Sequence, residues 1–213
     1  RNNKIAIYSF LSLLLIYLSA SIIYGFTYVN DKIFQKQNLI FLESDNWVSS
    51  SYGAPPITIS TPEVLIRNTD SLIFSLVEST SKSEFSHNNI KDPLTIRLTN
   101  FKLPENSSSI RLQDVMMRSI ETIEKLGVKN IITKFEKFQT PNEAEGLMIY
   151  GSADFPLDKT NQFRKSKYKI FGFINNQDYK QIFISWEEND NYIVEIIDRI
   201  VNSIELVKNK TDL

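Results

Sequence analysis

The sequence predicts an α+β protein, an antiparallel sheet covered by helices, preceded by one transmembrane helix. Three observations predict this class. A long apolar segment without charge opens the chain, several later segments alternate apolar and polar residues, and two segments carry apolar residues three and four apart. Alternation with a period of two is typical of strands with one buried face, and spacings of three and four are typical of amphipathic helices.

Composition limits the functional classes. The 213 residues are enough for one ordinary domain with an appendage. With 24 basic and 25 acidic residues and a net charge of −1, nothing global points to nucleic acid. There is no cysteine and only one histidine, His87, which excludes thiolate nucleophiles, Cys-ligated metals and zinc sites built on several histidines. We expect no catalytic residue, metal or cofactor, and His87 to be a solvated loop residue.

The first element is the apolar segment from Ile5 to Val29. At about 1.5 Å per residue, it is long enough as a helix to cross a hydrocarbon core of about 30 Å. Arg1 and Lys4 precede it, which favours a cytoplasmic N-terminus and an extracytoplasmic C-terminal domain, periplasmic in a bacterium. A cleaved signal peptide is the alternative, but its apolar core usually runs only about 7–15 residues. We expect a retained single-pass anchor.

Small residues gather on one face of this predicted helix. At about 100° per residue they fall within an arc of about 140°. They are Ala6, Ser9, Ser12, Ser19 and Ala20. Because small residues let another helix approach closely, we expect this face to bind a transmembrane helix of a partner. The alternative is that the serine hydroxyls bond to their own helix and face lipid.

The distribution of apolar, turn-forming and alternating residues divides the chain into four segments. We expect an anchor over 1–30, a connector with turn-forming residues over 31–56, an α+β domain over 57–208 and a tail over 209–213. Within the domain, a polar loop is expected over 81–93. The first strands are expected at ITI (57–59), VLIR (64–67), LIFSLVEST (72–80) and LTIRLTNFKL (94–103).

A helix is expected next, with Ser109 as its cap and Gly127 as its C-terminal stop. Sheet segments follow, and the last two form a hairpin: IITKFEKF (131–138), GLMIYGSADF (146–155), YKIFGFI (168–174) and QIFISW (181–186).

The last helix begins near Asp190, whose carboxylate suits the positive end of a helix. Its expected apolar face consists of Ile193, Ile197, Val201 and Ile204. Residues 204–206 are expected to add a final strand.

One basic run lies at the start of the hairpin and comprises Arg164, Lys165, Lys167 and Lys169. It is a candidate contact for anionic lipid or for an acidic partner face. The alternative is a solvated hairpin edge, where lysine discourages unwanted strand pairing.

The chain from about Ile57 to Leu206 resembles the PsbP-like superfamily, which includes photosystem extrinsic subunits and a Ran-binding nuclear import factor. The resemblance is carried by ITISTP (57–62), YGSADF (150–155), YKIFGFINNQDYKQIFISW (168–186) and YIVEIIDRIVNSIEL (192–206). It implies an α/β/α sandwich and a domain that acts by binding a larger assembly. The membrane anchor is a departure from these members.

The expected function is that of a non-catalytic accessory or assembly subunit of a membrane protein complex. Its expected partners are an integral membrane complex and membrane lipid, not nucleic acid. The first alternative is a membrane-tethered carrier for a small apolar or lipid ligand, and the second is a hydrolase. A cavity lined by Phe and Tyr favours the carrier, and a filled core favours the accessory subunit.

Overall fold

The chain divides into two compact units, Arg1–Asp45 and Asn46–Leu213. The computed structural model describes residue 17 and the ranges 47–68, 82–86, 94–104, 111–157, 162–190 and 193–206. The predicted strand over 72–80 lies outside these residues, as does the predicted anchor apart from Tyr17, which is helical. Within the described residues, no helix is long and apolar enough to cross a membrane.

The second unit is built from antiparallel sheets. In its described part, a three-stranded sheet has the order β1-β2-β10, with bounds β1 (Val48–Tyr52), β2 (Ile57–Thr61) and β10 (Glu205–Leu206). The larger sheet has seven described strands, in the order β3 (Ile66–Asn68), β4 (Lys82–Ser86), β5 (Leu94–Lys102), β9 (Asp178–Glu187), β8 (Gln162–Asn175), β7 (Glu145–Leu157) and β6 (Lys129–Gln139). Every strand pair in both sheets is antiparallel.

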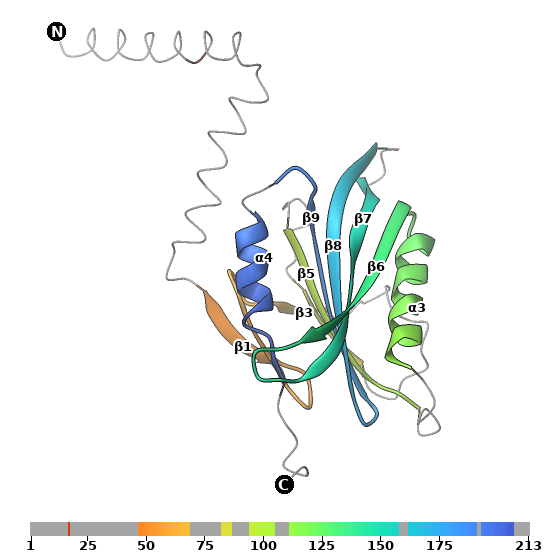
Figure 1. Ribbon diagram of the computed structural model, residues 1–213. Coiled ribbons are helices and arrows are strands. Elements are labelled where there is room, and N and C mark those ends of the chain that lie inside the picture. Colours follow the sequence, from red (N-terminus) through yellow and green to blue (C-terminus); the bar gives the residue numbers. More distant parts are fainter. Residues whose placement is uncertain are drawn as a thin grey trace, which may run out of the picture. The chain divides into compact units, whose positions relative to one another are not determined.

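Two described helices lie on opposite sides of the larger sheet (Figure 1): α3 (Leu112–Lys125) and α4 (Ile193–Val201). We call the side with Gly172 the α3 face, because Met116 of α3 lies against that glycine. The opposite side, the α4 face, carries Lys169, whose ammonium group is 3.8 Å from Asp198 of α4. The antiparallel sheets with two helices match the predicted α+β class.

Helix α3 packs one apolar stripe on the sheet. Val115, Met116, Ile120 and Ile123 are buried, at the three-to-four spacing of one helix face. The helix ends as predicted at Gly127, whose φ of 90° suits a residue without Cβ. The prediction of its start was wrong, because the N-cap is Arg111 rather than Ser109. No side chain caps this end, and the Arg111 guanidinium instead pairs with Asp114 at 3.1 Å.

Helix α4 buries more isoleucine than predicted. Its buried residues are Ile193, Ile196, Ile197 and Ile200, whereas Val201 is only partly buried. Ile204 is fully buried but lies beyond the helix end. The backbone N–H of Ile193 donates to Asp190 Oδ1 at 3.2 Å, which confirms the expected role of this carboxylate at the helix start.

The final strand forms as predicted, but it joins the smaller sheet. Leu206 pairs with Ile57 of β2, and Ser203 Oγ accepts from the backbone N–H of Ser60 at 2.8 Å. The smaller sheet also contacts the α4 face, since the rings of Tyr52 and Phe85 lie 5.0 Å apart.

Three predicted boundaries need correction. Strand β1 lies inside the expected connector over 31–56, and β4 lies inside the expected polar loop over 81–93. Strand β8 begins at Gln162 rather than at 168, so the basic run is part of a strand. The last hairpin is confirmed, because β8 and β9 pair from Ser166↔Glu187 to Asn175↔Asp178.

Candidate functional site

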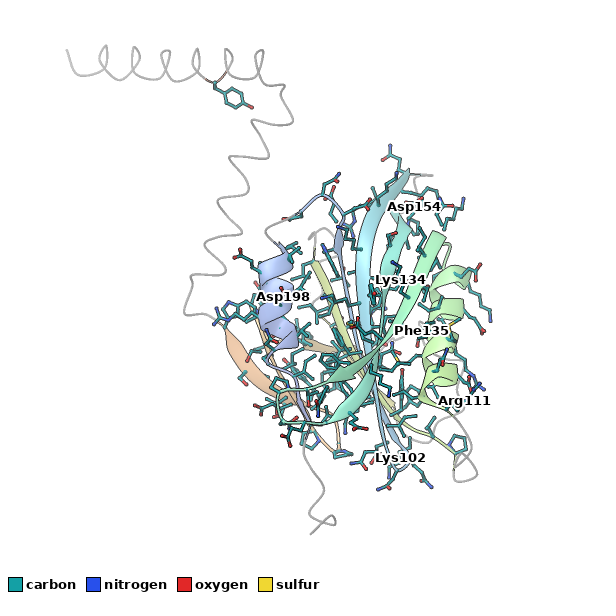
Figure 2. The ribbon with its side chains drawn as sticks, in the orientation of Figure 1. Lys102, Arg111, Lys134, Phe135, Asp154 and Asp198 are labelled. Carbon is teal, nitrogen blue, oxygen red and sulfur yellow. The ribbon has the colours of Figure 1, made fainter. Side chains whose placement is uncertain are left out.

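A basic cleft lies between the β1–β2 turn and the strands β3, β4, β5 and β9. It has a volume of about 400 Å³. Its polar walls come from Arg67, Ser83, Asn100, Lys102, Asp178 and Lys180, and Gly53 and Ala54 of the turn also line it. Figure 2 shows Lys102 at the end of the sheet opposite Asp154, so the cleft is far from the outer end of the β7–β8 hairpin.

Strand register brings the cleft residues together on the α4 face. Ser83, Asn100 and Lys180 stand directly opposite one another on β4, β5 and β9. Neighbouring strands are about 4.8 Å apart, so these three side chains form one row. Lys102 and Asp178 face each other in the next row toward the sheet end. Three segments far apart in the sequence therefore supply one continuous polar wall.

The carboxamide of Asn100 is an unsatisfied group in this wall. Asn100 is only 6% exposed, and neither its Nδ2 nor its Oδ1 has a hydrogen-bond partner among the described residues. Leaving a buried polar group without a partner costs about 1–3 kcal/mol. Gly53 lies against this carboxamide with a φ of 81°, and a Cβ there would overlap Asn100 Nδ2. Only glycine therefore fits the turn above Asn100 without displacing one of the two.

Lys180 brings a positive charge into the wall. It is 4% exposed, and burial lowers the pKa of its ammonium group, while Asp178 raises that pKa by a smaller amount. Arg67 and Lys102 are exposed and form no ion pair with another described residue. Among the described lining residues, three basic side chains against one carboxylate leave an excess of two positive charges. The chemistry of this cleft is that of an anion site.

A second charged group lies on the α3 face and is structural. Arg97 Nε is 3.3 Å from Glu84 Oε1, and the Glu84 side chain is 2% exposed. Burial lowers the pKa of Arg97, and the Glu84 carboxylate acts in the opposite direction. This pair joins β5 to β4, and its carboxylate is buried while the Arg97 side chain is 22% exposed.

The predicted basic run is divided by the sheet. Register places Arg164 on the α3 face and Lys165, Lys167 and Lys169 on the α4 face, because neighbouring residues of a strand point to opposite sides. Lys169 pairs with Asp198, and Lys165 stands opposite Asp154 on β7. The four residues therefore do not form one patch. Lys165 and Lys167 remain exposed on the α4 face.

The predicted partner-binding residues of the anchor, Ala6, Ser9, Ser12, Ser19 and Ala20, lie outside the described residues, as does His87. The cleft was not among the predicted sites. A signal for it exists in the pattern of β5, where Ile96 and Leu98 are followed in the same alternation by Asn100 and Lys102. Lys180 likewise lies on the same face of β9 as Ile182 and Ile184.

The chain matches no protein-family model and no curated protein sequence. Its structure is similar to several solved structures at low identity. Cyanobacterial PsbP (CyanoP) from Synechocystis is 10% identical with a TM-score of 0.49, and the match covers 78% of this chain and 95% of that one. LpqN of Mycobacterium tuberculosis, a protein involved in cell envelope biogenesis, is 9% identical with a TM-score of 0.43, covering 77% and 93%.

A protein of Bacteroides thetaiotaomicron is 8% identical with a TM-score of 0.41, and the match covers 72% of this chain. The match spans only 46% of the length of the Bacteroides protein. All three TM-scores are below 0.5, and we therefore base the α+β class on the strand order and helices described above.

Proposed function

We propose that this protein is a non-catalytic accessory or assembly subunit of a membrane protein complex, tethered by a single-pass anchor with its domain outside the cytoplasm. The observation that carries the proposal is the packed core between α3 and the larger sheet. There, Met116, Ile170 and Tyr179 are each 0–1% exposed and belong to one packed cluster of described residues. A core packed in this way favours a domain that acts through its surface.

The alternative, a membrane-tethered carrier of a small apolar or lipid ligand, requires an apolar cavity of several hundred Å³. The aromatic residues that would line such a cavity instead pack on one another. Phe138 lies 4.7 Å from Phe171 and 6.0 Å from Phe173, and Phe101 lies 4.7 Å from Tyr179, measured between ring centroids. These contacts favour the accessory subunit over the carrier.

A hydrolase is disfavoured by the geometry of the cleft. The serine that lines the cleft is Ser83, and it stands in the same row of the sheet as Lys180. Among the described residues, Ser83 Oγ forms no hydrogen bond with Lys180 or with another base. An activated serine needs its base within hydrogen-bond reach, about 2.6–3.2 Å.

The test uses the predicted small-residue face of the anchor. Ser12→Leu combined with Ala20→Leu fills this face, and the matched control combines Leu11→Ile with Leu18→Ile on the opposite face. Each full-length protein is purified from its native membrane in mild detergent, and co-purifying proteins are identified by mass spectrometry. We expect the Ser12/Ala20 variant to lose its partners while remaining in the membrane, because bulky residues prevent close helix approach.

Two results decide between the candidates. If the Ser12/Ala20 variant retains every partner at wild-type yield, the anchor only tethers the protein and does not bind the partner. Solvent extraction of the purified wild-type protein provides the second result: a lipid or apolar molecule at one equivalent per chain would favour the carrier instead.

A further inference from the structure

The basic cleft holds more positive charge than its own residues balance. Lys180 is almost completely buried, and Asp178 is the one carboxylate among the described residues that line the cleft. Placing a lysine in a buried wall without a strong partner is unfavourable, because burial penalises the charged form. Such a charge is stabilised when an anion enters the cleft and neutralises it.

The donors of the cleft converge on a single volume. Lys180 and the Asn100 carboxamide are cross-strand neighbours, and such neighbours have Cβ atoms about 4.5–5.5 Å apart. Lys102 stands one row toward the sheet end on β5, and Arg67 stands one row the other way on β3, two strands away from Asn100. Both side chains line the same cleft as Lys180 and Asn100. An anion bound in the cleft therefore meets positive charge from more than one side.

We propose that this cleft binds the phosphate group of a phosphorylated small molecule. A phosphate monoester carries a charge of about −1.5 to −2 at neutral pH, which matches the excess of two positive charges. A carboxylate would leave one charge unbalanced. The planar guanidinium of Arg67 suits bidentate contact with phosphate oxygens, and lysines bind them as point charges.

Asn100 supplies the additional, orienting contact. Its carboxamide is buried and has no hydrogen-bond partner among the described residues, and Nδ2 donates to a phosphate oxygen when the ligand reaches the inner wall. The cleft, at about 400 Å³, has more space than a phosphate group fills, and the ring of Phe85 lines the remainder. The space left over fits the organic part of a phosphate ester.

The test is a titration of the full-length protein in mild detergent and phosphate-free buffer. Calorimetry measures binding of inorganic phosphate, glycerol 3-phosphate and acetate. We expect saturable binding of both phosphates and weaker binding of acetate. A short-chain, soluble phosphatidic acid tests a lipid source of the same monoester group, and binding of this probe alone would place the ligand in the membrane.

Variants locate the binding. Arg67→Gln and Lys102→Gln change exposed side chains, so the fold is expected to survive, and circular dichroism verifies this. Each is expected to weaken phosphate binding by about tenfold, the effect of about 1.4 kcal/mol in lost charge-assisted contact. Lys167→Gln, an exposed lysine outside the cleft, is the matched control and should bind phosphate as the wild type does.

Absence of saturable phosphate binding at millimolar concentration would overturn the proposal. So would equal losses in the Lys167 control and the two cleft variants, or acetate binding as tight as phosphate. The proposed accessory function does not depend on this ligand, since that function rests on the packed core and is tested by co-purification.

Discussion

The contact between Met116 and Gly172 makes the packing of α3 on the sheet directly testable. Met116 is fully buried, and its side chain occupies the space that a Cβ on Gly172 would need. Met116→Ala removes Cγ, Sδ and Cε, which at about 0.8 kcal/mol each plus a cavity term lowers the free energy of unfolding by about 2.5–4 kcal/mol. Met117, its partly exposed neighbour on the same helix, provides the matched control. Met117→Ala is expected to cost less than about 1 kcal/mol.

The partner substitution tests whether the two residues share one space. Gly172→Ala alone is expected to cost about 1–3 kcal/mol, because the added methyl overlaps Met116 Sδ. In the double variant, the methyl enters the space left by the methionine, so its cost should fall below the sum of the single costs by about 1 kcal/mol. Urea unfolding of the full chain in mild detergent, followed by circular dichroism, measures the wild type, the two single variants, the double variant and the Met117→Ala control. Additivity within about 0.3 kcal/mol would show that the Met116 side chain and the added methyl do not compete for one space.

Three further predictions concern charge and boundaries. Arg97→Met should destabilise the domain by about 3–5 kcal/mol, because the buried Glu84 loses its guanidinium, and adding Glu84→Gln should recover most of this in the same urea assay. Since burial lowers the pKa of Lys180 below 10.5 despite Asp178, the unfolded chain binds its proton more tightly, and the stability of the wild type should rise with pH between the lowered pKa and 10.5. Lys180→Met should lack this rise, and an identical pH profile for both proteins would contradict it. The fragment Asn46–Leu213 should be soluble and unfold in one cooperative transition on heating, whereas aggregation would show that the unit needs the preceding segment.

The elements with strong periodicity were predictable from the sequence. Strand β5 alternates clearly, the β8–β9 hairpin has a polar turn between two apolar runs, and Gly127 ends a regular helix. In each case the local pattern and the tertiary packing agree, so the prediction is reliable.

The missed strands have a different cause. Strand β1 reads VSSSY, and its serines mimic turn composition, although its burial alternates toward Tyr52. Strand β4 reads KSEFS, and its polar character hides the fact that Glu84 is buried by pairing with Arg97. In β4, the polar side chain is accommodated by a partner on another strand, and no local pattern reports that partner.

The basic cleft was missed for the same reason. Arg67, Asn100 and Lys180 belong to three strands, and only the register of the sheet places them together. The local signal was the break in the apolar alternation of β5 at Asn100 and Lys102. Taken alone, such a break indicates only that the strand is leaving the core. The predicted basic run was the reverse case, because residues adjacent in sequence point to opposite faces of β8.

The most direct test of the central proposal is the mass of the protein in its native membrane extract. The full chain is isolated in mild detergent, and light scattering with size-exclusion chromatography gives the protein mass of the particle. The accessory role predicts a particle much heavier than the 24.7 kDa chain, with other integral membrane proteins in fixed ratio. A particle containing one 24.7 kDa chain and no other protein would contradict it.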